Sequence, residues 1–205
     1  MMNRLVGATA MVVLLGGTAA AQGPAFGVLG GLTSSKVVVS GEQISVTLDS
    51  RTGFAAGVSA RMPLGTMLDL EVDGLYAQKG FKISDGGDSA ELKLAYIDIP
   101  VMLSYQLGSG EVAPFLLGGG TLSIKAGCSV AATSGDVSAS ADCQDITGDE
   151  QKSTDLGLTF GGGLRFNRFS VQARYTLGMT DAFDDGDDTV SSKNRALFFL
   201  AGFSF

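Results

Sequence analysis

The chain has 205 residues and a formal net charge of −7, with 30 glycines, two cysteines, no tryptophan and no histidine. The negative charge argues against nucleic acid as a partner, and the lack of histidine excludes a serine nucleophile activated by that residue. Hydrophobic residues make up 45% of the chain, yet after residue 21 no apolar run reaches the ~18 residues that a membrane-spanning helix needs.

The first 21 residues have the pattern of a secretory signal peptide. Arg4 supplies the positive charge, residues 5–17 form a short apolar run, and residues 19–21 are alanines that fit a cleavage site before Gln22. An N-terminal membrane anchor is the alternative, but the run is too short for a spanning helix. We expect export through the Sec pathway and a mature chain, residues 22–205, that forms one domain.

Eight segments with alternating apolar residues follow, and each is a predicted β-strand. In chain order they cover residues 26–33, 52–62, 67–82, 91–107, 112–124, 154–166, 169–179 and 194–205. Pro100 lies inside the fourth segment and has no N–H to donate to a ladder, so we expect a β-bulge there. The fifth segment contains Gly118, Gly119 and Gly120, and the assignment of its two faces stays open.

The connections between these segments alternate between short and long. Short turns are expected at 63–66, 108–111 and 167–168, and long polar connections at 34–51, 84–90, 125–153 and 180–193. Outer-membrane barrels have short periplasmic turns and longer external loops, whereas a soluble sandwich has no reason to sort its loops by length. The sequence therefore predicts an all-β fold, an eight-stranded antiparallel up-and-down transmembrane β-barrel.

The final segment has an apolar face on the last residues of the chain, where soluble proteins usually fray. This face consists of Leu197, Phe199, Ala201, Phe203 and Phe205. We expect it to contact lipid, and we expect the strand to close the barrel by pairing with both the first and the seventh strand. Phe198 and Leu200 then face inward, where polar residues are expected.

The opposite faces of the strands are richer in polar residues and should line the lumen. An eight-stranded barrel leaves an interior only wide enough for side chains, and an unpaired buried charge is costly. We predict a charge network that plugs the lumen, in which Arg61, Arg165 and Arg174 meet Glu71, Asp73 and Asp98. The alternative is that these charges lie on the solvated face of a soluble sheet.

The two cysteines, Cys128 and Cys143, lie in one polar connection of a chain that we expect to be exported. We therefore expect a disulfide, worth about 3 kcal/mol on the chain-entropy model. Two unrelated thiols are the alternative. A zinc site is disfavoured because two cysteines without histidine supply half of a ligand set.

The acidic connection before the last strand is a weak candidate for a cation site. It holds Asp181, Asp184, Asp185, Asp187 and Asp188. Hard cations bind clustered carboxylates, but no glutamate closes an EF-hand loop here, so we favour a solvated external loop. In a weaker form of the hypothesis, divalent cations bridge this loop to anionic lipopolysaccharide. No cofactor is expected, because the glycine runs lack Walker spacing.

Four segments resemble a known family: residues 74–82, 96–100, 114–120 and 174–178. Together they resemble the PorT-like outer-membrane β-barrel domain family, over essentially the whole mature chain. The resemblance implies a barrel akin to OmpX and the OmpA transmembrane domain, in the outer membrane of a Gram-negative-type bacterium. It implies no shared catalytic residues. It also implies that the terminal aromatic residues, Phe203 and Phe205, are recognised by the barrel-assembly machinery.

The function predicted from these features is that of a monomeric, non-enzymatic outer-membrane barrel. Its external loops would serve a structural or surface-interaction role, and its partners would be outer-membrane lipid and lipopolysaccharide. A narrow channel or solute conduit is the first alternative. A soluble periplasmic ligand-binding barrel is the second.

Overall fold

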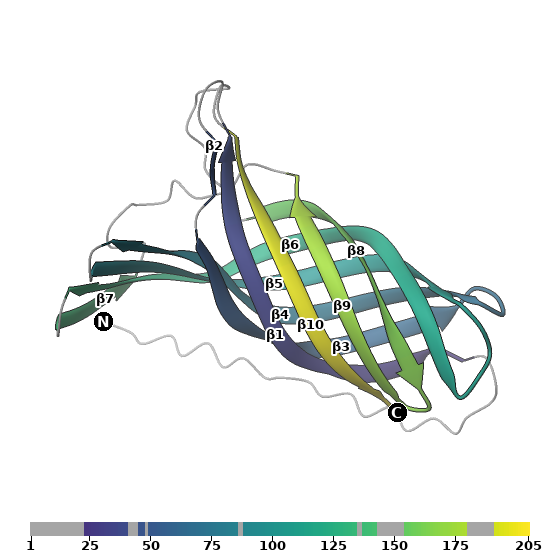
Figure 1. Ribbon diagram of the computed structural model, residues 1–205. Coiled ribbons are helices and arrows are strands. Elements are labelled where there is room, and N and C mark those ends of the chain that lie inside the picture. Colours follow the sequence, from purple (N-terminus) through teal and green to yellow (C-terminus); the bar gives the residue numbers. More distant parts are fainter. Residues whose placement is uncertain are drawn as a thin grey trace, which may run out of the picture.

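The computed structural model describes residues 23–40, 45–47, 49–85, 88–134, 137–142, 154–179 and 191–205. The strands in this part are β1 (Ala25–Ser40), β2 (Ser45–Thr47), β3 (Asp49–Pro63), β4 (Leu68–Asp85), β5 (Asp88–Gln106), β6 (Val112–Ser134), β7 (Val137–Asp142), β8 (Thr154–Phe166), β9 (Phe169–Gly178) and β10 (Ser191–Ser204). Eight of them form an antiparallel barrel in the order β1-β3-β4-β5-β6-β8-β9-β10 (Figure 1). The predicted fold class is confirmed, whereas the signal-peptide region 1–21 lies outside the described residues.

The last strand closes the barrel. β10 pairs with β9, where Phe203 lies opposite Phe169, and with β1, where Ser204 lies opposite Gly27. The backbone N–H of Phe205 donates to the carbonyl oxygen of Phe26 at 2.9 Å. The expected double pairing is confirmed, and closure leaves the barrel without an open sheet edge.

Several strands continue well beyond the predicted boundaries at the end opposite the short turns. β1 extends to Ser40 and pairs with β2, β4 and β5 pair as far as Asp85 opposite Asp88, and β6 pairs with β7 (Figure 1). All four long connections predicted at 34–51, 84–90, 125–153 and 180–193 therefore include residues that belong to strands. A backbone ladder needs no apolar face to continue, so alternation of apolar residues marks only the part of a strand that faces lipid.

The bulge predicted at Pro100 is wrong. Pro100 lies opposite Thr121 in regular register with β6. Against β4 the ladder has a gap beside Pro100 but resumes in the same register, so the missing N–H is accommodated without an inserted residue. The register shift in β5 falls between Ala95 and Tyr96, in the ladder with β6.

Two glycines on neighbouring strands differ sharply in the space around them. Gly57 on β3 faces the lumen, and a Cβ atom there would overlap the carbonyl oxygen of Gly74 on β4. Gly30 on β1 faces outward, and a Cβ atom there would meet nothing within 4 Å. Glycine is needed at position 57 because the two strands approach closely as the sheet curves.

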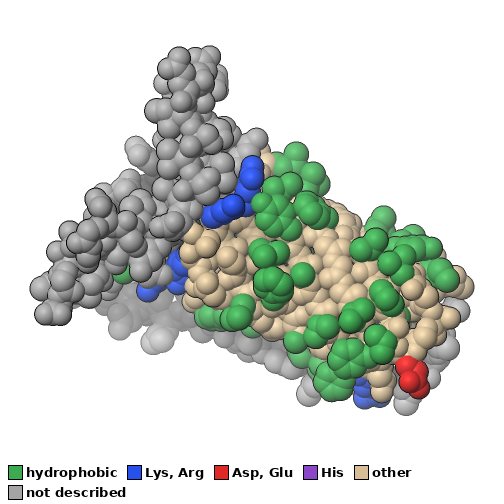
Figure 2. Space-filling model, in the orientation of Figure 1, with side chains coloured by type: hydrophobic (Ala, Val, Ile, Leu, Met, Phe, Trp, Pro, Cys, Tyr) green, Lys and Arg blue, Asp and Glu red, His purple; other side chains and the backbone are tan. Residues whose placement is uncertain are grey.

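The outer surface of the barrel is a band of exposed apolar side chains (Figure 2). Leu32 is 59% exposed and Phe199 is 55% exposed. Of the terminal residues expected to face lipid, Phe199, Ala201 and Phe205 are exposed, while Leu197 and Phe203 are half-buried. No helix in the described ranges is long and apolar enough to cross a membrane.

Aromatic side chains gather at two levels of this band. Beside the turn at 167–168, four rings contact one another in sequence: Phe166, Phe169, Phe203 and Phe205. Toward the other end, Phe54 contacts Tyr76 and Phe160 contacts Tyr175. Two aromatic girdles that flank an apolar band are typical of a transmembrane barrel.

Candidate functional site

The lumen is crossed by an arginine that joins two opposite walls. Arg174 lies on β9, and its two acidic partners lie on β4, which is four strands away from β9 in either direction around the barrel. The guanidinium donates to Asp73 Oδ2 at 2.5 Å and to Glu71 Oε1 at 2.7 Å. It also donates to Gln172 on its own strand. Arg174 is only 2% exposed, so it bridges the lumen out of contact with solvent.

Two further arginines extend this cluster toward the short-turn end. Arg165 lies 3.6 Å from Asp69 and 3.8 Å from Glu71, and Arg61 lies 3.6 Å from Asp69. The Arg165 guanidinium also lies 4.6 Å from the centroid of the Phe115 ring, within cation–π range. The three arginines meet three carboxylates, so the cluster is electrically balanced.

One residue of the predicted network has a different partner. Asp98 on β5 does not contact any of the three arginines. Instead it accepts from Lys79 Nζ on β4, and both of its carboxylate oxygens lie 2.8 Å from that nitrogen. Asp98 lies higher along the barrel axis than Glu71 and Asp73, and strand parity alone does not give that height. The structure thus groups Arg61, Glu71, Asp73, Arg165 and Arg174 with Asp69, and Asp98 with Lys79.

Lys79 was not predicted as a lumen residue of importance. Its Nζ also donates to Ser123 Oγ at 3.2 Å and lies 4.8 Å from the Tyr96 ring centroid and 5.9 Å from that of Phe198. The signal was available, because Lys79 continues the inward parity of Asp73, Leu75 and Ala77. The ion pair therefore lies beneath aromatic rings at the end of the lumen nearer the long connections.

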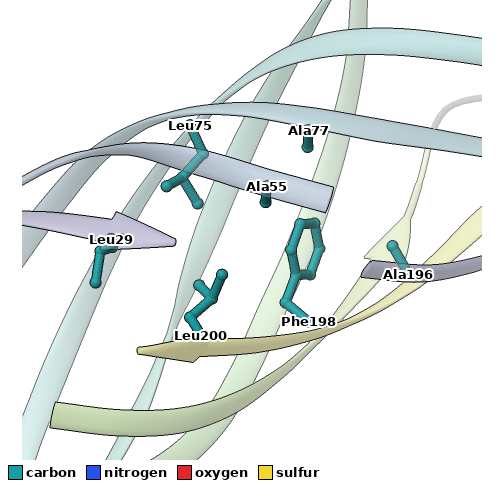
Figure 3. Packing of buried hydrophobic residues seen from close by; sticks show 7 residues of the cluster. All are labelled: Leu29, Ala55, Leu75, Ala77, Ala196, Phe198 and Leu200. Carbon is teal, nitrogen blue, oxygen red and sulfur yellow. The ribbon is translucent and has the colours of Figure 1, made fainter. Parts of the chain in front are cut away.

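Part of the lumen is apolar, which the sequence did not lead us to expect. Phe198 and Leu200 are each 3% exposed and pack inside the barrel with residues of β1, β3 and β4 (Figure 3). The full cluster is Leu29, Ala55, Leu75, Ala77, Ala196, Phe198 and Leu200. A second, smaller cluster on β5 and β6 contains Met102, Phe115 and Leu117. The inward parity of Phe198 and Leu200 was right, but the expectation of polar residues at their level was wrong.

The lumen also contains a row of bonded hydroxyl groups and a small cavity. Three threonine hydroxyl groups form a row of hydrogen bonds across β6, β8 and β9. Thr159 lies 2.6 Å from Thr121 and 2.7 Å from Thr176. A cavity of about 10 Å³ lies near the short-turn end, beside Arg61 and Arg165. That volume holds about one water molecule.

Other sites expected from the sequence fall wholly or partly outside the described residues. Cys128 lies on β6, in a strand and not in a loop, but Cys143 lies outside the described part. The aspartates at 181, 184, 185, 187 and 188 lie outside it as well. Within the described ranges, no group of three or more His, Cys, Asp or Glu side chains could hold a metal ion.

Comparison with solved structures finds barrels that resemble this one only distantly. Ail, the attachment invasion locus protein of Yersinia pestis, is 17% identical, with a TM-score of 0.43 over 88% of this chain and 99% of its own. Neisserial surface protein A is 16% identical, with a TM-score of 0.44 over 89% and 99%. The outer membrane enzyme PagL is 13% identical, with a TM-score of 0.45 over 83% and 98%. Likeness at this level carries no inference about activity.

A family match is more informative. No curated protein matches the chain. Residues 20–184, however, match the outer membrane protein beta-barrel domain. The match spans most of the chain, and its description agrees with the barrel fold. The chain therefore belongs to the outer membrane protein beta-barrel domain family.

Proposed function

We propose that this protein is a non-enzymatic outer-membrane barrel that acts through its external segments, with a lumen plugged against solute flow. The observation that carries the proposal is the bridge from Arg174 to Asp73 and Glu71, which joins opposite walls of the barrel. A hydrated ion could pass only if this buried bridge opened. Breaking a buried ion pair leaves uncompensated charges in a poorly solvated interior.

The rest of the lumen supports the same proposal. Below the bridge lies the cluster of Arg61, Asp69 and Arg165, and toward the other end lie the Lys79–Asp98 pair and the rings over it. The apolar cluster around Phe198 fills the space between β10 and the β1–β4 wall. Each layer is built from side chains of different strands, so no single rotamer change clears the lumen.

Conductance across a planar bilayer tests the plug. The purified protein, checked for folding by heat-modifiable migration on a gel, is expected to give no steady current. The double variant Lys79→Ser/Phe198→Ala is a sensitivity control. It shortens two side chains of the plug at one level of the lumen, so brief channel openings are the most that it should give. Steady unitary currents from the wild-type protein would contradict the proposal and favour the narrow-channel alternative.

The external segments are the proposed working part. β1–β2, β4–β5 and β6–β7 extend beyond the barrel at the end that carries the long connections. Cysteine labelling on intact cells checks their exposure. Thr147→Cys should react with a membrane-impermeant maleimide, while Ser109→Cys, in the short turn, should react only after the membrane is permeabilised. Equal labelling of both positions, or recovery of the protein in the soluble periplasm, would sink the proposed orientation.

The absence of an enzymatic activity is also part of the proposal. It is supported by the lack of histidine and by the ion pairs that join the lumen carboxylates to arginine or lysine. A soluble periplasmic barrel is disfavoured because the described outer face carries many exposed apolar side chains.

The remaining expectations rest on the sequence. We propose export through the Sec pathway, recognition of Phe203 and Phe205 by the barrel-assembly machinery, and contact with outer-membrane lipid and lipopolysaccharide. The narrower likeness to PorT-like domains rests on the four segments named above. We propose it as a subfamily assignment without carrying over any role in secretion.

A further inference from the structure

Two basic residues face each other on the outer surface of the barrel. Lys36 on β1 lies directly opposite Arg195 on β10 in the ladder that closes the sheet. By strand parity both point outward, since Leu32 and Phe199 on the same faces are exposed. Like charges directly opposite each other across a ladder are destabilising, so this pairing calls for a compensating anion.

The described part of the protein supplies no such anion. Neither Lys36 nor Arg195 forms an ion pair or side-chain hydrogen bond with a described residue. Five of the six carboxylates whose side chains are described face the lumen, and the sixth, Glu111, lies beside a short turn. Figure 2 shows basic side chains next to the apolar ones at the long-connection end, and the acidic side chains drawn on that face lie at the other end.

The pair lies at the edge of the apolar band. One residue pair below it, Leu197 lies opposite Ser34, and the next exposed apolar residues are Leu32 and Phe199. From Phe26, beside the short turns, to Lys36 the strand advances about 33 Å. With a tilt of about 40° this is a height of about 25 Å, the usual height of the lipid-facing band. Lys36 and Arg195 therefore sit where lipid headgroups begin.

We propose that Lys36 and Arg195 together bind a phosphate group of a phosphorylated glycolipid of the outer leaflet. The two cations would neutralise the phosphate. The hydroxyl groups of Ser34, on the same face of β1 as Lys36, and of Thr52, opposite Ser34 on β3, lie close by. The acyl chains would cover Leu32 and Phe199. The apolar surface directly below the pair is what favours a lipid over a free phosphate ion. The site rests on the proposed membrane location and orientation.

The test measures the thermal stability of the purified barrel in a non-ionic detergent, with and without diphosphorylated lipid A. Lipid A should raise the unfolding temperature of the wild-type protein. Its affinity should fall about fivefold in Lys36→Gln or Arg195→Gln and about thirtyfold in the double variant, from about 1 kcal/mol per basic residue. Arg168→Gln, which removes one charge at the opposite end, is the matched control and should keep wild-type affinity.

One variant should change stability in opposite directions without and with lipid A, and this separates lipid binding from a structural role. Without lipid, Arg195→Glu should stabilise the barrel, because it converts a like-charge pair into an opposite-charge pair. With lipid A the same variant should lose the stabilisation seen for the wild type. An equal shift in wild type and double variant overturns the site, and an equal shift with inorganic phosphate overturns the lipid assignment. Steady current in the bilayer test, in contrast, overturns the plug and leaves the lipid site standing.

Discussion

At the scale of single residues, Arg174 is the side chain on which the interior depends most. It is buried, it joins opposite walls, and it pairs with two carboxylates, of which Glu71 also lies 3.8 Å from Arg165. Asp73 Oδ1 has no hydrogen-bond partner among the described residues, so the bond from Arg174 to Oδ2 carries most of the compensation of that charge. The compensation of the Asp73 charge therefore rests mainly on one guanidinium.

Replacing Arg174 by methionine should destabilise the protein strongly. The variant Arg174→Met keeps much of the side-chain volume but leaves Asp73 and Glu71 buried together, at an expected cost of about 3–5 kcal/mol in the free energy of unfolding. Urea unfolding in detergent micelles measures it. The triple variant with Asp73→Asn and Glu71→Gln should recover most of the loss, and Arg168→Met, in an exposed turn, should stay within about 0.5 kcal/mol of wild type. An unchanged single variant would mean that the bridge contributes nothing.

The parity of a position along a strand predicts whether its side chain faces the lumen or the outer surface. It does not predict which charged residue that side chain will contact. Asp98 and Lys79 show the limit. Both lie on inward positions of their segments, yet which charges meet depends on the stagger between strands, and this stagger is set by the closed barrel as a whole. Asp69 and Lys79 were therefore missed as partners, although the inward face of every strand except the ambiguous fifth was predictable.

At the scale of elements, the strands behave differently inside and outside the lipid band. Within the band, apolar alternation located every barrel strand to within a few residues. Beyond it, β6 continues to Ser134 through small and polar residues that carry no such pattern. These extensions are held by ladder hydrogen bonds to neighbouring strands, and those pairings are not visible in the composition of a single segment.

The curvature of the wall predicts a contrast between two glycine substitutions. Gly57→Val should prevent folding or lower the unfolding temperature sharply, since its Cβ atom would overlap a backbone oxygen of β4 that cannot move aside. Gly30→Val should be neutral or stabilising, because the added side chain enters open space and valine favours strands. Heat-modifiable migration after refolding compares the two. If both variants refold equally well, the close approach of β3 and β4 at Gly57 does not require a glycine.

The disulfide between Cys128 and Cys143 stays a prediction from the sequence. Cys128 lies on β6, and two cysteines in one exported segment are expected to pair. Alkylation of the denatured protein without reductant, followed by mass spectrometry, should modify neither thiol. Modification of both would leave two separate cysteines.

At the scale of the whole molecule, closure depends on the last strand. Seven of the eight barrel interfaces join strands that are consecutive among the barrel strands, and only the pairing of β1 with β10 joins the two ends of the chain. The sequence predicted this closure because the final residues are apolar where a soluble terminus would be polar. Strand parity placed Phe198 and Leu200 inside, but it did not predict the apolar cluster around them, because contacts between strands depend on the stagger of the closed barrel.

Deleting Phe205 should slow assembly more than it weakens the finished barrel. The side chain is 74% exposed and contacts only the ring of Phe203 among described aromatic residues, so little packing is lost. The variant should reach the outer membrane at a reduced level, while protein refolded in detergent should unfold near the wild-type temperature. Pulse-chase fractionation measures the first and thermal unfolding the second. If the variant assembled at the normal rate but unfolded at a lower temperature, Phe205 would serve the stability of the barrel and not its assembly.

The hydrogen bond between Phe205 and Phe26 has a consequence for the order of the chain. It brings the two ends of the barrel sequence together on the same rim, so a short linker could join them. New termini could then be opened in the turn at Gly108, between β5 and β6, without removing any of the eight interfaces. The eight barrel strands form a closed hydrogen-bonded ring. The ring itself therefore does not determine which strand must come first in the chain.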